Sequence, residues 1–242
     1  MPSVAQDKIY TITTITTHRL LRKRRTAFRP KCVFNVPLEK CTERTSSTDT
    51  ETWLGTDAPV ILTEASPPNF NFLFSTRGCR RGGGTASITK CNMHTNEVIF
   101  NSHSSFEYHA FVFSSPPILC ITVYRPPKYS TSFIREFSEL LSIIYATFNR
   151  ILITGDFNLH VDISSDPMSR EFLNLLHCFN FNQHVTQPTH SRGRTLDLVI
   201  SYGLSIGAPS VVDLAVSDHF CVFFTITSFN QREAPVRTVN VT

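Results

Sequence analysis

The sequence predicts an α/β or α+β domain built in layers, because segments typical of strands alternate with two segments of helical periodicity. The strand candidates are rich in branched and aromatic residues and end at Pro, Gly or polar residues. They are 70–74, 85–88, 106–113, 118–124, 150–154, 195–201 and 220–227. In such a domain the helices cover the faces of a sheet.

Two helices are expected from the spacing of apolar residues. The first follows Ser132, a residue type that caps helix N-termini. The second follows Asp166-Pro167, which combines an N-cap carboxylate with proline in the first helical position. The apolar residues at helical intervals are Phe133, Phe137, Leu140, Leu141, Ile144 and Phe148 in the first helix, and Phe172, Leu175, Leu176 and Phe179 in the second.

Residues 1–48 differ from the rest, since no long periodic apolar pattern runs through them, and we expect this segment to be irregular. Its stretch 18–31 holds seven Lys or Arg and no acid. Such a run neutralises phosphates, serves as a nuclear address or forms a solvated arm, and the sequence leaves these alternatives open. The folded domain is expected to span 49–228, followed by a polar tail, 229–242.

Composition limits the class of protein. With 242 residues, of which 41% are hydrophobic, the chain has enough apolar material for one sizeable core. No apolar run is long enough to span a membrane, and the first residues lack the apolar segment of a secretory signal. The seven cysteines are scattered singly, which argues against a Cys-x-x-Cys zinc site and a complete set of disulfides. We therefore expect a reducing compartment, the nucleus or the cytoplasm.

Polar residues gather where strand candidates begin or end. The four segments are ETWL (51–54), YRPP (124–127), GDFN (155–158) and SDH (217–219). A further carboxylate, Asp197, lies within an otherwise apolar strand candidate. Because an unpaired buried carboxylate is costly, Asp197 needs a partner, and a histidine from a neighbouring strand would supply one.

The carboxylates of Glu51, Asp156 and Asp218 are hard oxygen ligands of the kind that Mg²⁺ or Mn²⁺ prefers. Each signal alone has an ordinary alternative. Glu51 suits a helix N-terminus, and both GDFN and Asp218-His219 suit a turn. The combination, in this order and at strand ends, is much more specific for a metal-dependent site.

The motifs ETWL, YRPP, GDFN, TLDLVI and SDH resemble, in this order, those of the endonuclease/exonuclease/phosphatase superfamily. Together with RGGG (81–84) and QPTH (187–190), they are similar in wording to the endonucleases of LINE-type (non-LTR) retrotransposons. The resemblance covers about residues 50–228. It implies a four-layer α/β sandwich of the DNase I-like type. It also implies a DNA endonuclease that nicks phosphodiester bonds, with Mg²⁺ or Mn²⁺ as cofactor and the DNA phosphate backbone as partner.

The resemblance further implies a role for each matching residue. Glu51 would bind the metal ion, and Asp156 would bind it and position or deprotonate the attacking water. Asn158 would hold the phosphate and the water, and Tyr124 would donate a hydrogen bond to the phosphate.

The remaining roles concern the last strand. His219 would contact the scissile phosphate and stabilise the developing charge, with Asp197 orienting its imidazole. Asp218 would help to place the metal or the water. These residue types suit in-line attack on a phosphodiester, which needs an activated water and neutralised phosphate oxygens. A positioned base typically contributes about 10²- to 10⁴-fold.

Five residues are candidates for contact with nucleic acid. Phosphate contacts by arginine position a duplex without reading its sequence. For the arginines the alternative is a solvated surface, and for the other two it is a structural role in a loop. The candidates are Arg125, Thr189, His190, Arg192 and Arg194. Neither a membrane nor an obligate protein partner is expected.

The resemblance fails before Glu51. The superfamily begins with a buried strand that carries an asparagine near the metal, followed by a helix and the strand that leads to the glutamate. We find no counterpart of this first strand and helix. Asn35 is the only candidate asparagine, and TERTSSTDT (42–50) is polar where an apolar strand is expected. The domain is therefore expected to be divergent or truncated at its N-terminus, and no reverse transcriptase sequence follows residue 228.

Three functions remain open from the sequence. The first is an active Mg²⁺-dependent DNA endonuclease. The second is a catalytically inactive, retrotransposon-derived remnant that binds nucleic acid weakly at most. The third is a phosphatase of the same superfamily that acts on a small phosphorylated substrate. The intact motifs after residue 50 favour the first as the inherited function.

Overall fold

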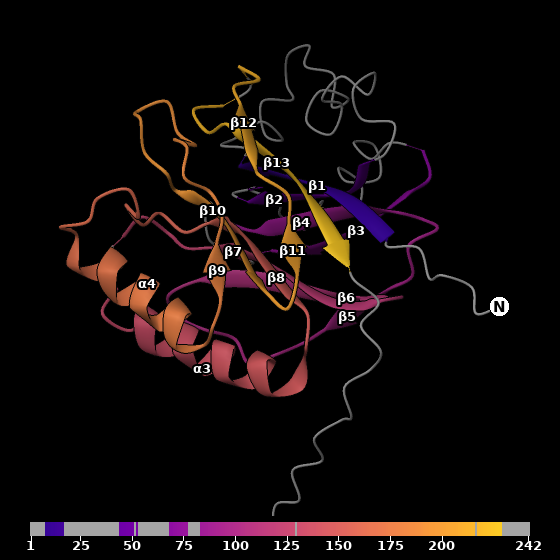
Figure 1. The fold of residues 1–242 in the computed structure, drawn as a ribbon, viewed down its shortest axis with the longest axis horizontal. Coiled ribbons are helices and arrows are strands. Elements are labelled where there is room, and N and C mark those ends of the chain that lie inside the picture. Colours follow the sequence, from indigo (N-terminus) through magenta and orange to yellow (C-terminus); the bar gives the residue numbers. More distant parts are fainter. Residues whose placement is uncertain are drawn as a thin grey trace, which may run out of the picture.

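The computed structural model describes residues 8–16, 44–50, 52, 68–76, 83–128, 130–215 and 217–228. Two β-sheets are stacked in this part of the chain, and helices α3 and α4 lie together against the outer face of one of them (Figure 1). The described residues therefore form three layers in the order helices, sheet, sheet. This is the α/β sandwich of the DNase I-like type that the sequence predicts; the expectation of a fourth layer concerns residues outside the described ones.

The seven-stranded sheet has the strand order β11-β13-β1-β2-β4-β3, with β12 also paired to β13. β1 and β2 are parallel, and the other pairs are antiparallel. Its strands are β1 (Lys8–Thr16), β2 (Arg44–Thr50), β3 (Phe70–Ser75), β4 (Thr85–Lys90), β11 (Ser205–Ile206), β12 (Ser210–Val212) and β13 (Cys221–Ser228).

The six-stranded sheet has the order β5-β6-β7-β8-β10-β9. Its one parallel pair is β7 and β8, whose connection contains α3. This is the βαβ connection that parallel neighbours require. Its strands are β5 (Thr95–Val98), β6 (Glu107–Ser114), β7 (Pro117–Tyr124), β8 (Ile151–Asp156), β9 (Asn182–Gln183) and β10 (Asp197–Tyr202).

Both expected helices are present, as α3 (Phe133–Thr147) and α4 (Pro167–Cys178). Asp166 caps α4 as predicted, because its side chain accepts a hydrogen bond from the Ser169 N–H at 2.8 Å. Ser132 precedes α3 but does not cap it with its side chain. Its hydroxyl lies 3.0 Å from the Ser130 hydroxyl instead.

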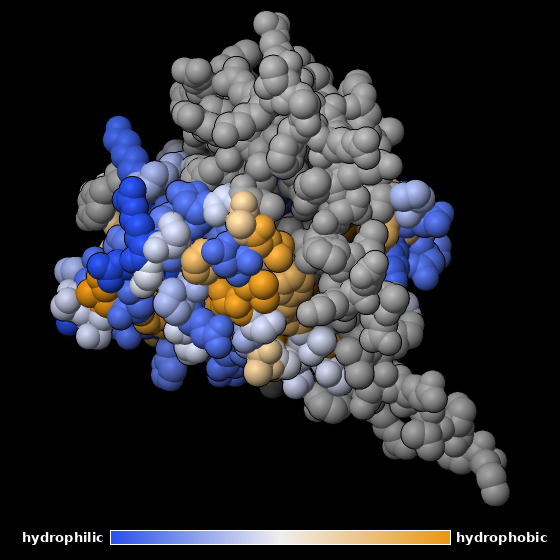
Figure 2. Space-filling view, turned by 90° about the horizontal axis from the view of Figure 1, so that it is seen from above, coloured by the Kyte–Doolittle hydropathy of each residue, from blue (hydrophilic) through white to orange (hydrophobic). Residues whose placement is uncertain are grey.

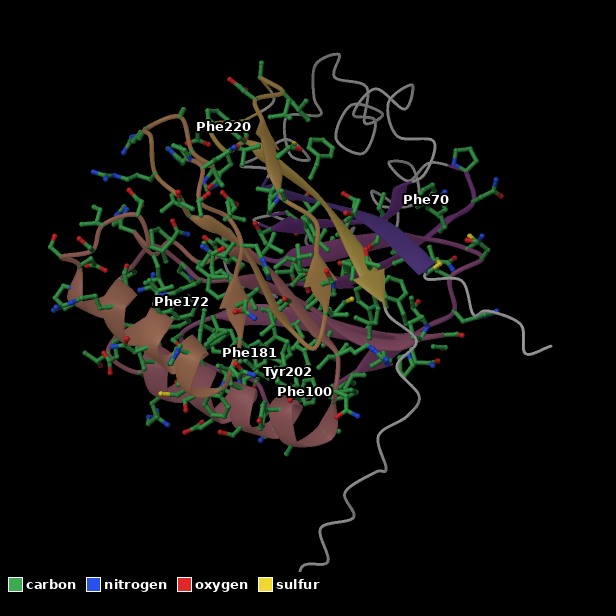
Figure 3. The ribbon with its side chains drawn as sticks, in the orientation of Figure 1. Phe70, Phe100, Phe172, Phe181, Tyr202 and Phe220 are labelled. Carbon is green, nitrogen blue, oxygen red and sulfur yellow. The ribbon has the colours of Figure 1, made fainter. Side chains whose placement is uncertain are left out.

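Side-chain alternation along β7 divides the core in two. Leu119, Ile121 and Val123 point toward the helices and join the larger cluster. Ile118 and Cys120 point toward the other sheet and join the cluster between the sheets. Figure 3 shows aromatic side chains of the larger cluster, among them Phe172 and Phe181, between the helices and the six-stranded sheet.

The expectation that residues 1–48 are irregular is wrong for two segments. β1 lies between β13 and β2, where it pairs antiparallel with the former and parallel with the latter. β2 includes most of the polar stretch 42–50, in place of the apolar strand that the resemblance implies, and its residues 46–50 are buried. The domain therefore does have a strand before Glu51, although the candidate Asn35 lies outside the described residues.

A buried β2 of polar composition is possible because hydroxyls of Ser46 and Thr48 find partners, although the Ser47 hydroxyl has none among the described residues. The Ser46 hydroxyl donates to the Ile88 carbonyl at 3.0 Å. The hydroxyls of Thr48 and Thr154 lie 3.3 Å apart and link the two sheets. Satisfied hydroxyls avoid most of the cost of burial, so apolar residues are not required here. Across the described residues, neither α3 nor α4 has the length and hydropathy to span a membrane.

Candidate active site

Three of the predicted site residues end or begin neighbouring strands of the six-stranded sheet. Tyr124 pairs with Asp156, and Asp156 pairs with Asp197. Alternation places Asp156 on the same face as Thr154, which contacts the seven-stranded sheet. The two carboxylates and the tyrosine thus lie side by side on the face between the sheets, and all three residues are at most 2% exposed.

The GDFN turn has a backbone that its glycine and asparagine make possible. Gly155 has φ +138, and a Cβ on it would lie 1.9 Å from the Val123 carbonyl oxygen. Asn158 has φ +47, in the left-handed region that asparagine tolerates better than most residues. Gly155 therefore lets β8 approach β7 closely, just before Asp156.

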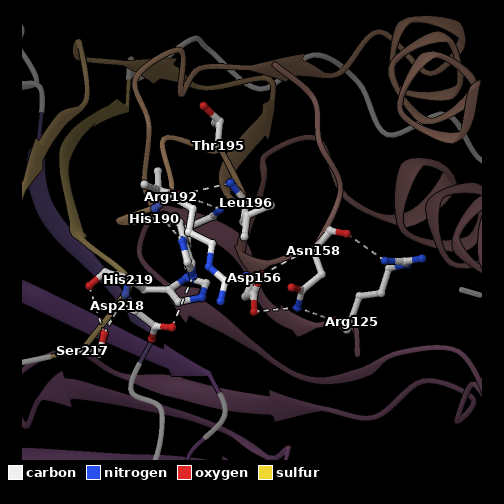
Figure 4. A network of polar contacts seen from close by, with 12 residues as sticks. Arg125, Asp156, Asn158, His190, Arg192, Thr195, Leu196, Ser217, Asp218 and His219 are labelled. Carbon is white, nitrogen blue, oxygen red and sulfur yellow. Dashed lines mark hydrogen bonds and ion pairs between the residues drawn. The ribbon is translucent and has the colours of Figure 1, made fainter. Parts of the chain in front are cut away.

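Asn158 holds the Asp156 carboxylate from two directions (Figure 4). Its backbone N–H donates to Oδ1 of Asp156 at 3.0 Å, and its side-chain amide donates to Oδ2 at 2.8 Å. The same amide donates to the Arg125 carbonyl at 2.8 Å. Hydrogen bonds to a carboxylate favour its charged form, so this turn presents Asp156 as an ordered anion.

The predicted pairing of Asp197 with a histidine is present. Nδ1 of His219 lies 2.8 Å from Oδ2 of Asp197, and the two side chains are only 2% and 1% exposed. Burial alone would lower the pKa of His219. The charge and hydrogen bond of Asp197, with smaller effects of Asp156 and Asp218, outweigh this and raise that pKa to about 9. In the metal-free protein at neutral pH, His219 is therefore an imidazolium.

The turn 189–194 is fastened to the segment that carries His219. The Phe220 N–H donates to the Thr189 carbonyl at 2.7 Å, and the Ser191 N–H donates to the Asp218 carbonyl at 2.8 Å. The Thr189 hydroxyl accepts hydrogen bonds from the N–H groups of Leu196 and Asp197, both at 3.0 Å. This turn thus connects the start of β10 to the start of β13.

His190 belongs to this site as a donor to a carboxylate. Its Nδ1 accepts a hydrogen bond from the Arg192 N–H at 3.0 Å, so in the neutral ring the proton resides on Nε2. Nε2 lies 3.3 Å from Oδ2 of Asp218. The His190 ring meets the His219 ring edge to face, with centroids 4.7 Å apart. Burial and the charge of His219 lower the pKa of His190, and Asp218 opposes them.

The described donors fit a hard divalent cation. Asp156, Asp197 and His219 have ligand atoms within 4.8 Å of one another, and so do His190, Asp218 and His219. The two histidines each direct a ring nitrogen at a carboxylate. The oxygens of Asp156 and Asp218 are therefore the donors best suited to Mg²⁺ or Mn²⁺. Glu51, the third predicted ligand, lies outside the described residues.

Three of the five candidates for nucleic-acid contact are buried. His190 is 8% exposed and directs Nε2 at Asp218, and the other two lie deeper, which corrects the prediction for them. Thr189 is 0% exposed, and its hydroxyl accepts the two backbone N–H groups named above. Arg125 is 3% exposed, and its guanidinium donates to carbonyls of the GDFN turn. Side chains that are buried and bonded to backbone groups inside the protein do not reach a DNA phosphate.

The other arginine candidates do reach the surface. Arg192 is exposed on the turn 189–194. Arg194 has 43% of its side chain exposed and forms an ion pair with Asp162 at 3.1 Å. Both therefore remain candidates for contact with phosphates.

Sequence reasoning missed Glu107, which links the two sheets beside the site. Its carboxylate accepts the Gly84 N–H at 2.7 Å. The Gly84 carbonyl in turn accepts the N–H of Thr52, the residue after Glu51, at 3.3 Å. The one signal available was an acid at the start of a strand, which in most proteins is a solvated residue.

Both a segment of the sequence and the fold resemble those of known proteins. Residues 118–223 match a family model described as endonuclease-reverse transcriptase. The endonuclease domain of TRAS1, a telomere-specific non-LTR retrotransposon, superposes with a TM-score of 0.68 at 12% identity. The alignment covers 90% of this chain and 98% of that domain. No curated protein matches the chain in sequence.

Two further solved structures have the same fold. The AP endonuclease LMAP from Leishmania major has a TM-score of 0.69 at 15% identity, over 90% of this chain and 88% of its own. The 3′ phosphatase NExo from Neisseria, bound to a product DNA hairpin, has a TM-score of 0.64 at 15% identity, over 92% and 100%. These similarities show that the chain shares the DNase I-like fold of these proteins, and that its segment 118–223 resembles the endonuclease-reverse transcriptase family.

Proposed function

We propose that the chain is a divalent-metal-dependent endonuclease that nicks DNA by phosphodiester hydrolysis. The observation that carries the proposal is the buried cluster of Asp156, Asp197 and His219 at the strand ends, in which an imidazolium faces an ordered carboxylate. Such a pair supplies both charges that the reaction needs: a carboxylate for the water and a cation for the phosphate.

Each site residue is proposed to have its own role in the hydrolysis. Asp156 accepts the proton of the attacking water or orients it, and Asn158 fixes this carboxylate through the two hydrogen bonds described above. His219 donates from Nε2 to a phosphate oxygen, since its Nδ1 is held by Asp197. Tyr124, at the end of β7, is proposed to donate to the phosphate as well.

A metal ion would be held by Asp156 and Asp218, with Glu51 as the further proposed ligand. When bound, Mg²⁺ or Mn²⁺ neutralises the nonbridging oxygens and acts as a Lewis acid on the phosphate. Because hard cations retain several waters and take substrate oxygens, few protein carboxylates suffice.

DNA is the proposed substrate because of the structurally similar proteins and because of the residues exposed beside the site. NExo is solved with product DNA, and LMAP is an AP endonuclease. In the view of Figure 2, the described surface has a hydrophobic patch flanked by hydrophilic residues. Arg192 and Arg194, on the turn beside His219, are the proposed contacts with backbone phosphates. We place this activity in the nucleus or the cytoplasm.

The test is nicking of supercoiled plasmid in Mg²⁺ by wild type and by Asp156→Ala and His219→Ala. Asp213→Asn and His177→Ala change the same residue types at exposed positions outside the site and serve as matched controls. Nicking by wild type and both controls, but not by the two site variants or in EDTA, is expected.

Loss of activity must be separated from loss of fold. Each protein is therefore checked by circular dichroism and a thermal melt before the assay. Folded wild-type protein that leaves plasmid intact would contradict the proposal and favour the inactive remnant. Hydrolysis of a small phosphomonoester without plasmid nicking would instead favour the phosphatase.

A further inference from the structure

Arg125, the second residue of YRPP, is buried beside the GDFN turn. It follows β7 directly, and its backbone N–H donates to the Asp156 carbonyl at 2.8 Å. The residue is 3% exposed. A buried arginine is unusual, because desolvation of its charge must be offset by partners.

The partners of the Arg125 guanidinium are on the turn itself and on α4. Nη1 donates to the carbonyls of Phe157 at 3.2 Å and Asn158 at 3.0 Å. Nη2 donates to Sδ of Met168 at 3.3 Å. The planar group lies over the Phe133 ring, with Cζ 4.9 Å from its centroid. The two carbonyls of the turn are thus held by one donor group in a fixed plane.

Asn158 in turn binds Arg125 through its side chain. Its side-chain amide donates to the Arg125 carbonyl and to Oδ2 of Asp156, both at 2.8 Å. The guanidinium of Arg125 fixes the backbone of Asn158, and the side chain of Asn158 fixes both the backbone of Arg125 and the Asp156 carboxylate. This closed set of bonds supports the left-handed conformation of Asn158 at φ +47.

We propose that Arg125 is a positioning residue, which orders Asn158 and through it the Asp156 carboxylate, and which does not touch DNA. Its kinetic consequence rests on the function proposed above, whereas its structural consequence does not. Lysine cannot replace it, because an ammonium group has a single nitrogen. It offers no second nitrogen for Sδ of Met168 and no planar group to lie over the Phe133 ring.

The kinetic test compares Arg125→Lys with Arg192→Met, assayed on a short DNA duplex over a range of salt concentrations. Arg125→Lys is expected to lower kcat about tenfold or more and to leave KM and the salt dependence of binding unchanged. Arg192→Met is expected to raise KM and to reduce the salt slope by about one. Arg170→Lys, an exposed position on α4, controls for the substitution itself. Unchanged kcat in folded Arg125→Lys, or a weaker salt slope, would overturn the proposal.

A second measurement uses the wild-type protein in EDTA and needs neither activity nor a folded variant. Side-chain NMR should find the Arg125 Nη protons and the Asn158 amide protons protected from exchange with water, and unmoved when duplex DNA is added. Rapid exchange of the Arg125 Nη protons, or a shift on addition of DNA, would overturn the positioning role. If wild type fails to nick plasmid, the function is lost, but this exchange result still decides the role of Arg125.

Discussion

Nε2 of His109 lies 2.7 Å from the Ser87 hydroxyl, so a histidine of the six-stranded sheet is bonded to a serine of the seven-stranded sheet. Nδ1 lies 2.8 Å from the Thr85 hydroxyl, and His109 is 5% exposed. Burial lowers the pKa of His109 to about 3. The imidazole is therefore neutral in the folded protein at all but strongly acidic pH.

The free energy of unfolding should fall as the pH drops below 6.5. The unfolded chain then binds a proton at His109 that the folded chain binds only near pH 3. At about pH 5 this linkage removes about 2 kcal/mol relative to pH 7.5. Urea unfolding of wild type and His109→Gln at both pH values isolates the contribution, because the other titrating groups are shared. An equal pH-dependent loss in both proteins would contradict the assignment.

Asp197→Asn should remove the charge that keeps His219 protonated. The pKa of His219, raised to about 9 in the metal-free protein, is expected to fall toward its ordinary 6.5. Nicking should decrease about 100-fold or more at neutral pH, since a neutral ring stabilises phosphate charge poorly. NMR titration of the His219 ring measures the first effect. Asp162→Asn, which changes the contacts with the Arg194 side chain and the Thr195 N–H, should leave the titration as in wild type.

Gly155→Ala should destabilise the domain by at least about 3 kcal/mol. Its Cβ would lie 1.9 Å from the Val123 carbonyl oxygen, and alanine is strained at φ +138. Gly193→Ala is the matched control, because Gly193 has φ +73 but nothing within 4 Å of the added Cβ. That control should cost about 1 kcal/mol, from strain alone. Denaturant unfolding measures the free energy of unfolding of both variants. Similar losses would show that the contact of the added Cβ with β7 does not cause the destabilisation.

Glu136→Gln should cost about 2 kcal/mol, because a carboxylate that accepts four hydrogen bonds loses acceptors for buried donors. Those donors are the backbone N–H groups and hydroxyls of Ser104 and Ser105, at 2.6–2.9 Å. Burial raises the pKa of Glu136, but the hydrogen bonds outweigh it and lower that pKa to about 2. The stabilisation is therefore complete above 4.5 and is lost as the pH falls toward 2.

The control for this variant is Glu139→Gln on the exposed face of α3. Glu139 pairs with Arg135 at 2.8 Å, and its side chain is 52% exposed. A surface pair of this kind contributes about 0.5 kcal/mol or less. A Glu136→Gln loss no larger than that of the control, in thermal melts at neutral pH, would disprove the proposed role of the carboxylate.

The helices and the long apolar strands could be predicted because their signals are local. Periodic apolar residues marked α3 and α4, and branched residues marked β7 and β8. β1 was missed although Ile, Tyr and Thr, which favour strands, make up all of it but Lys8. Its basic and polar surroundings hid this local signal, and its partner β13 lies at the other end of the domain.

The candidate site likewise has one part that could be predicted from the sequence and one part that could not. The Asp197–His219 pair could be predicted, since a carboxylate in an apolar strand requires a partner. Arg125 could not, because a cation after a strand is ordinarily a surface residue. The carbonyls of Phe157 and Asn158 that bind it face it only once the GDFN turn has formed.

The position of β1 between β2 and β13 also sets the order in which the domain is assembled. β1 is made first, yet its register with β13 extends from Lys8↔Ser228 to Thr14↔Val222. During synthesis β1 cannot pair with β13 until β13 has been made. The seven-stranded sheet is therefore completed only after residue 228 has left the ribosome. A chain that stops short of β13 leaves one edge of β1 open to strands of other molecules, and such a truncation should make the domain prone to aggregate.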